Sequence, residues 1–173
     1  MPRLFAERLR PDASGRSAVN SHDLRLEAPG SPGRRRFADS HASLGHVVSL
    51  LAAQAGNGPS IGLSEGCTRL GRQLLGHLAA EEEFLLPKFR EANAHEAARL
   101  DAEHASIREL LGEIELDAAG GTLRPESMER LLGALTSHAS HEKATFYPWA
   151  QDRYLGWVWA RAARRLSAQG QVV

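Results

Sequence analysis

Hydrophobic residues recur every three or four positions along most of the chain, beginning near Phe37. This spacing places them on one face of an α-helix, and no stretch shows the sustained alternation of a β-strand. Ser64 is the predicted N-cap of the second helix, and Pro87 is predicted to kink or tighten its last turns. Four helices joined by short loops predict an all-α, antiparallel up-down four-helix bundle. The predicted helices cover 37–55, 64–93, a segment ending at 120, and 125–148.

The two ends of the chain differ from this central region. Residues 1–36 are rich in proline, glycine and serine and include three consecutive arginines, so they predict a flexible or loosely docked N-terminal arm. Residues 37–150 form the predicted bundle, and residues 151–173 a short C-terminal amphipathic helix and tail. Trp157 and Trp159 lie in this last segment, and a homodimer that uses them stays an open alternative.

The first two predicted helices resemble the last two. An offset of 63 residues relates the first helix to the third, and an offset of 61 relates the second to the fourth, including Pro87 and Pro148. A duplicated helical hairpin places two copies of its polar residues around a pseudo-twofold axis. The paired polar positions are His41 and His104, His77 and His138, and Glu81 and Glu142.

The spacing of these polar residues predicts a metal site. Each glutamate follows a histidine by four residues, so both side chains lie on one helix face, within the apolar stripe that must face the bundle interior. Buried carboxylates require compensating positive charge, and no lysine or arginine occupies these stripe positions. Four histidines and two glutamates are too many ligands for one tetrahedral zinc ion. They suit two ions bridged by the glutamates, predicted as an oxo- or hydroxo-bridged di-iron pair, with manganese or zinc as alternatives.

Other polar residues compete for a place in this site. His46 is the alternative to His41 on the first helix, but the repeat pairs His46 with Glu109, which favours His41. His141 is predicted to lie beside the site or on the surface. Glu82 is expected to face solvent, where it could accept a hydrogen bond from a ligand imidazole.

The composition narrows the classes of partner. Twenty-one basic residues balance twenty-one acidic ones, so the chain has no global attraction for nucleic acid or anionic lipid. The single cysteine, Cys67, excludes an intrachain disulfide framework and a cysteine-rich metal site. No apolar run is long enough to cross a bilayer, and the first residues lack the apolar stretch of a signal peptide. We therefore expect a cytoplasmic protein with no nucleic-acid or membrane partner.

Taken together, these residues resemble the hemerythrin-like (HHE cation-binding) family over about residues 37–150. The resemblance implies a non-haem di-iron centre that reacts with dioxygen, nitric oxide or peroxide. Arg108 stands where oxygen-carrying hemerythrins have a further histidine, so the chain is more similar to the four-histidine, two-glutamate branch that includes the repair-of-iron-centres proteins. The resemblance implies terminal ligands at His41, His77, His104 and His138, and bridges at Glu81 and Glu142.

The expected function is that of a small di-iron protein that binds or reacts with dioxygen, nitric oxide or peroxide in oxidative or nitrosative stress. Whether it turns over as an enzyme stays open at this point. The alternative is a non-catalytic iron or oxygen sensor, or an iron-binding regulatory module, whose metal occupancy controls a partner-binding surface. A metal-free helical interaction domain is a third interpretation.

Overall fold

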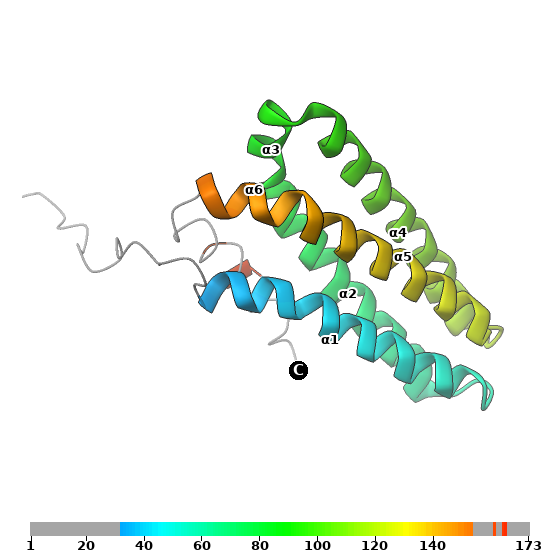
Figure 1. Cartoon of the computed structure of the whole chain (residues 1–173). Helices are drawn as coiled ribbons and strands as arrows, with labels where there is room; N and C mark the ends of the chain where they lie inside the picture. Colours follow the sequence, from blue (N-terminus) through cyan, green and yellow to red (C-terminus); the bar gives the residue numbers. More distant parts are fainter. Residues whose placement is uncertain (1–31, 154–160, 162–163, 166–173) are drawn as a thin grey trace, which may run out of the picture.

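The computed structural model describes residues 32–153, 161 and 164–165, and the regular secondary structure of this part of the chain is all α-helix. Four long helices form an antiparallel bundle, and two short helices extend it at one end (Figure 1). Neighbouring long helices pack in the cyclic order α1, α2, α4, α5. The elements are α1 (Pro32–Ala55), α2 (Ile61–Phe84), α3 (Leu86–Ala92), α4 (Ala94–Gly120), α5 (Pro125–Ala144) and α6 (Phe146–Arg153).

The starts of two helices differ from the sequence predictions. Helix α1 begins at Pro32 rather than Phe37, because proline suits the first turn of a helix, where its missing N–H is not needed. The N-cap of α2 is Ser60 rather than Ser64. Ser60 has an extended backbone, and its side chain accepts a hydrogen bond of 3.1 Å from the N–H of Leu63, whereas Ser64 lies inside the helix.

The two prolines end their helices rather than kinking them. Each proline lacks an N–H and its ring clashes with the carbonyl four residues earlier, so α2 stops at Phe84 and α5 stops at Ala144. A new short helix then begins after one linking residue, with Pro87 in the first turn of α3 and Pro148 near the start of α6. The breaks occur at matching positions of the repeat and place α3 and α6 over one end of the bundle.

The flanking predictions fall largely outside the described residues. The arm lies there as far as residue 31, as do Trp157, Trp159 and most of the predicted C-terminal helix. Helix α6 starts at Phe146 and includes only the first residues of that predicted segment. In the described part of the chain, no helix has both the length and the apolar character needed to cross a bilayer.

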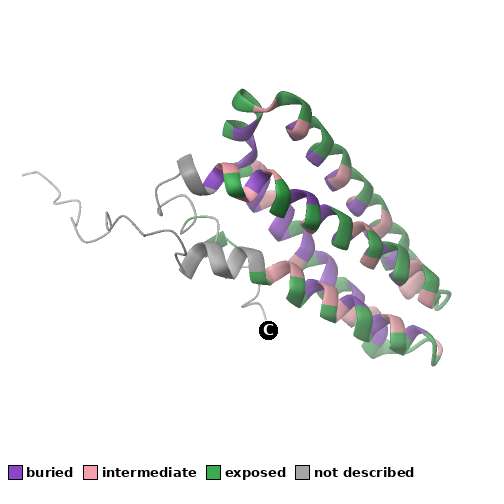
Figure 2. Cartoon of the chain, viewed as in Figure 1, coloured by how far each residue is buried: buried purple, intermediate pink, exposed green. Residues whose placement is uncertain are grey.

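The buried residues lie on the inward faces of the helices (Figure 2) and form two apolar clusters. The larger one fills the bundle among α1, α2, α4 and α5, and includes Leu74, Leu78 and Cys67, which is 1% exposed. The smaller one lies at the end covered by α3 and α6, around Phe89 and Phe146. Burial raises the pKa of the Cys67 thiol. Fully burying a leucine contributes about 1.5–3 kcal/mol, so these clusters hold the helices together.

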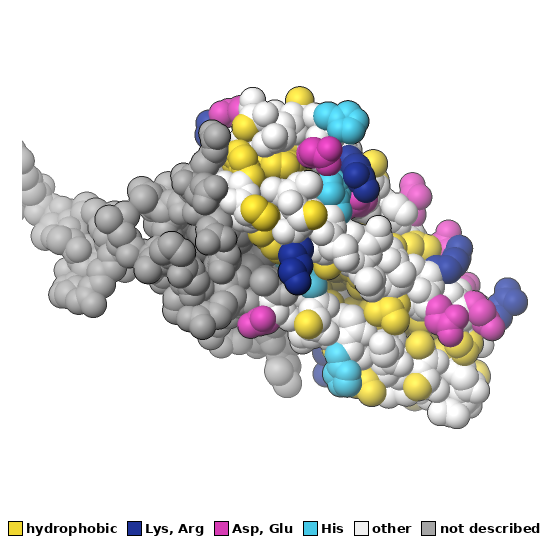
Figure 3. All heavy atoms as spheres, viewed as in Figure 1, with side chains coloured by type: hydrophobic (Ala, Val, Ile, Leu, Met, Phe, Trp, Pro, Cys, Tyr) yellow, Lys and Arg dark blue, Asp and Glu magenta, His cyan; other side chains and the backbone are white. Residues whose placement is uncertain are grey.

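Charged side chains of both signs are distributed over the surface. On the face drawn in Figure 3, basic and acidic side chains are interspersed rather than gathered into a patch of one sign. Several of them form exposed ion pairs, such as Arg90 with Asp101 and Arg130 with Glu113. Pairs of this kind contribute little stability each, so the fold depends on its apolar clusters.

Candidate metal centre

A layer of buried polar residues separates the two apolar clusters. In α2, Leu78 belongs to the larger cluster and Leu85 to the smaller one, and Glu81 lies between them. All six residues predicted as ligands meet in this layer. The layer is contributed by four helices, with His41 from α1, His77 and Glu81 from α2, His104 from α4, and His138 and Glu142 from α5.

These six residues form two overlapping groups of four that could each hold a metal ion. The first group contains His41 and His77, and the second contains His104 and His138, while Glu81 and Glu142 belong to both. The side chain of His41 is 8% exposed, and the other five are at most 1% exposed. Each half of the repeat therefore contributes two imidazoles, and the two carboxylates are shared.

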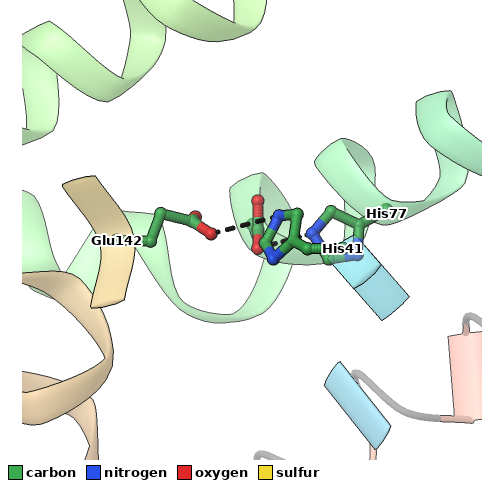
Figure 4. Close-up of side chains that lie close together, drawn as sticks. His41, His77 and Glu142 are labelled. Atoms are coloured by element: carbon green, nitrogen blue, oxygen red, sulfur yellow. Dashed lines mark ion pairs between the residues drawn. The ribbon is translucent and has the colours of Figure 1, made fainter. Parts of the chain in front are cut away.

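The separations between nitrogen and oxygen atoms fit ligands of common ions. Nε2 of His77 lies 3.0 Å from Oε1 of Glu81, within one helix. Between helices, Nε2 of His41 lies 3.4 Å from Oε2 of Glu142, as Figure 4 shows, and Nε2 of His104 lies 3.4 Å from Oε2 of Glu81. Two ligands that each lie about 2.1 Å from one ion are about 3.0–3.4 Å apart at ordinary coordination angles. The donor atoms are therefore already close to ligand spacing.

Three of the imidazoles are oriented by hydrogen bonds at their outer nitrogen. Nδ1 of His77 lies 2.7 Å from the hydroxyl of Ser40. Nδ1 of His104 donates to Glu82 at 2.8 Å, and Nδ1 of His138 donates to Glu103 at 3.1 Å. Because an ionised carboxylate can only accept a hydrogen bond, the bonds to Glu82 and Glu103 keep the proton on Nδ1 of His104 and His138. The Nε2 atoms of both imidazoles then face the centre with a lone pair available for a metal ion.

Sequence reasoning identified only part of this outer set of residues. Glu82 was expected to face solvent, with a hydrogen bond to an imidazole as a possibility; it is partly exposed and makes that hydrogen bond, whereas Ser40 and Glu103 were not anticipated. Glu103 also accepts from Nδ1 of His141 at 2.9 Å, so buried His141 supports the site without facing it. The hydroxyl of Tyr147, on α6, also donates to Oε1 of Glu81 at 3.1 Å.

The electrostatics of the layer indicate a need for cations. Desolvation, followed by repulsion from Glu81, raises the pKa of Glu142 well above its usual range. The pKa of Glu81 is lowered, because His77, His104 and His41 outweigh the effect of burial. Desolvation, aided by His77, lowers the pKa of His41 from 6.5 to about 3. Without metal, the surroundings therefore favour the protonated form of Glu142 and the neutral form of the His41 imidazole.

Unsatisfied atoms provide a direct test of whether metal ions fit this layer. Among the described residues, Nε2 of His104 and His138, Oε2 of Glu81 and both carboxylate oxygens of Glu142 have no hydrogen-bond partner of good geometry. Buried polar atoms of this kind are costly unless they are paired. No lysine or arginine of the described region forms an ion pair with these residues. Two cations would satisfy all of these atoms, so the donor set fits the group.

The comparison with protein families agrees with this geometry. Residues 33–150 match the family described as the hemerythrin HHE cation-binding domain. The chain belongs to the hemerythrin HHE family. We found no significant match among curated proteins or among solved structures. The family and the His/Glu cluster together make this hemerythrin-family chain a metal-binding protein.

Two further described histidines and the thiol of this hemerythrin-family protein lie away from the cluster. His46, the alternative to His41, is exposed on α1, and the side chain of His95 is 91% exposed. Cys67 is buried among leucines, and His22 lies outside the described residues. The structure thus brings the six predicted ligands together, and their coordination of metal stays a prediction.

Proposed function

We propose that this hemerythrin-family protein holds two iron ions and binds or reacts with small oxidants, namely dioxygen, nitric oxide or peroxide. The observation that supports the proposal is the overlap of two four-residue groups that share Glu81 and Glu142. Sharing two carboxylates between two imidazole pairs is how a helical bundle holds a pair of ions. When bound, a pair of iron ions supplies an open coordination position and electrons for a small oxidant.

The chain's own residues provide the setting for this chemistry. The two glutamates neutralise part of the charge of two divalent cations, and the remaining positive charge favours a small neutral or anionic ligand. The outer partners of the imidazoles fix their direction, and the apolar clusters on either side exclude water. The hydroxyl of Tyr147, which donates to Glu81, holds a proton at the edge of the layer.

The composition of the donor set also supports iron over the alternatives. Mixed imidazole and carboxylate ligands without thiolate suit iron, manganese and zinc, but only iron and manganese exchange electrons with an oxidant. Manganese or zinc loading is therefore a distinguishable outcome of elemental analysis. Oxidant chemistry in the protein interior also agrees with a site that contains no reactive thiol.

The first experiment is elemental analysis of protein purified with iron available. We expect close to two metal ions per chain for the wild type, and one or fewer for Glu81→Ala or Glu142→Ala. His95→Ala is the matched control, because His95 is exposed, and its metal content should equal that of the wild type. A wild-type content near zero would refute the proposal, and equal losses in all variants would mean that the ligands lie elsewhere.

The second experiment separates an enzyme from a sensor. Nitric oxide or hydrogen peroxide is added in excess to the reduced, iron-loaded protein with an electron donor, and product is counted against protein. Many turnovers per chain support catalysis. A single stoichiometric spectral change supports the sensor or iron-binding module, in which metal occupancy stabilises the bundle. No spectral change with either oxidant would refute the proposed reactivity.

A further inference from the structure

One surface pocket reaches a residue of the metal layer. It lies between α1 and α5, has a volume of about 290 Å³, and is lined by residues that include His41, Gly45, Ala139 and Lys143. His41 is also the most exposed of the six ligand candidates. Since a water molecule occupies about 30 Å³ of liquid, the pocket has room for a small molecule of a few heavy atoms.

The duplicated architecture offers an internal comparison for this pocket. The offsets of 63 and 61 residues relate the face between α1 and α5 to the face between α4 and α2. Gly45 then corresponds to Arg108, and Lys143 corresponds to Glu82. On the α2–α4 face, Arg108 donates to Glu82 at 2.8 Å, and the other oxygen of Glu82 accepts from Nδ1 of His104 at 2.8 Å. This face is filled by a bound pair of side chains.

On the α1–α5 face the same positions cannot form that pair. Gly45 has no side chain, and Lys143 has no acceptor atom to offer His41. Ala139 corresponds to Leu78, which is fully buried and belongs to the larger apolar cluster. Three substitutions within the repeat, each to a smaller or differently charged residue, therefore leave space beside His41 where its counterpart is covered.

Two further directions toward the layer, the side between α4 and α5 and the bundle axis, are covered by described residues. Between α4 and α5, Glu103 binds both His138 and His141. Along the bundle axis, the larger apolar cluster lies on one side of the layer and the aromatic residues Phe89 and Phe146 lie on the other. The described part of the chain shows no ion pair for Lys143, whose ammonium group therefore contributes uncompensated positive charge to the pocket.

We propose that the pocket between α1 and α5 is the access route and binding site through which a small neutral or anionic molecule reaches the metal pair. The broken symmetry directs that molecule to the position held by His41 and His77, whereas the position held by His104 and His138 is closed by Arg108 and Glu82. This inference rests on the proposed function, and it specifies which of the two ions meets the ligand.

The test introduces the side chains of the α2–α4 face at the matching positions of the α1–α5 face. One variant, Ala139→Leu, copies the buried leucine, and a second, Gly45→Arg with Lys143→Glu, copies the ion pair. The control is Gly133→Arg on α5, because a side chain at Gly133 meets no atom within 4 Å. All variants are compared with the wild type for metal content and melting temperature, so that a failure to fold is recognised.

Two measurements then report on access. In the metal-free protein, carbethoxylation of imidazoles by diethyl pyrocarbonate is followed residue by residue, with exposed His46 as the internal reference. In the reduced, loaded protein, the rate of nitric oxide binding is followed by stopped flow. We expect wild-type His41 to react and His104 to be protected. Both filled variants should slow His41 modification and nitric oxide binding by about one order of magnitude or more. The control variant should leave both rates unchanged.

The outcomes separate this inference from the proposed function. Filled variants that keep two metal ions but show unchanged rates for both reactions would overturn the access route and leave the proposed function intact. Modification of His104 as fast as His41 would overturn the asymmetry. A wild type that binds no metal would refute the proposed function, while protection of His41 in the filled metal-free variants would still support the pocket as the route to His41.

Discussion

In the metal-free protein, Glu142→Gln should increase stability, and the increase should grow with pH. The Glu142 side chain is fully buried, and desolvation and Glu81 raise its pKa in the folded state. A carboxyl group with a raised pKa binds more protons in the folded than in the unfolded state. Its contribution is therefore fully present below the unfolded pKa of about 4.3 and is lost as pH rises toward the folded pKa. Glutamine copies the protonated form and has no such dependence.

The size of this effect follows from proton linkage. Between the unfolded and folded pKa values of one group, stability changes by about 1.4 kcal/mol per pH unit. The free energy of unfolding of the wild type should thus fall relative to Glu142→Gln by about 2.7 kcal/mol over two pH units of that interval. Taking the difference between the two proteins removes the shared contribution of His41, whose lowered pKa opposes stability as pH falls below 6.5.

The assay is urea unfolding of chelator-treated protein at a series of pH values above the unfolded pKa of about 4.3, with linear extrapolation to water. Glu109→Gln is the control, because Glu109 is exposed on α4, and its difference from the wild type should be constant. Restoring iron should reverse the order of stability, since metal then takes the place of the proton on Glu142. A difference between wild type and Glu142→Gln that does not change with pH would refute the claim that this carboxyl is held protonated by its surroundings.

Three further predictions test the layer and the clusters around it. Chelation of metal should lower the melting temperature by about 10 °C, because one ion at a hundredfold excess over its Kd adds about 2.7 kcal/mol to the free energy of unfolding. Equal melting temperatures for the metal-free and metal-loaded forms would contradict this. Glu103→Ala should weaken metal binding about 10–100-fold in a chelator competition, whereas Glu109→Ala should not, and equal affinities would deny Glu103 its orienting role. Leu74→Ala should cost about 2–5 kcal/mol in urea unfolding, and exposed Leu116→Ala less than about 0.5 kcal/mol; similar costs would mean that the apolar cluster is misassigned.

The fold and the six ligand positions were predictable because both follow from spacing within single helices. A residue four positions after a histidine shares its helix face whatever the rest of the chain does, and the repeat then matched one hairpin to the other. The helix ends were less predictable. Ser60 and Ser64 are equally good N-cap residues in sequence, and only the backbone conformation before Ile61 decides between them.

The outer partners of the imidazoles depend on how helices lie against each other, which spacing within one helix does not determine. Glu103 directly precedes His104 in the chain, yet it binds His138 and His141 on α5. Ser40 precedes His41 but lies against His77 on α2. Both residues adjoin ligands in sequence and could have been suspected for that reason, but their actual partners required the three-dimensional arrangement.

The burial of Cys67 gives the protein a natural reporter of its own opening motions. Cys67 is the only cysteine in the chain, and it lies ten residues before His77, about 15 Å away along α2. A thiol-reactive dye can label it only in molecules whose leucine cluster has come apart, and the raised pKa keeps background labelling slow. Labelling rates with and without iron would therefore measure how strongly an occupied centre restrains the leucine cluster, whose side chains are not ligands.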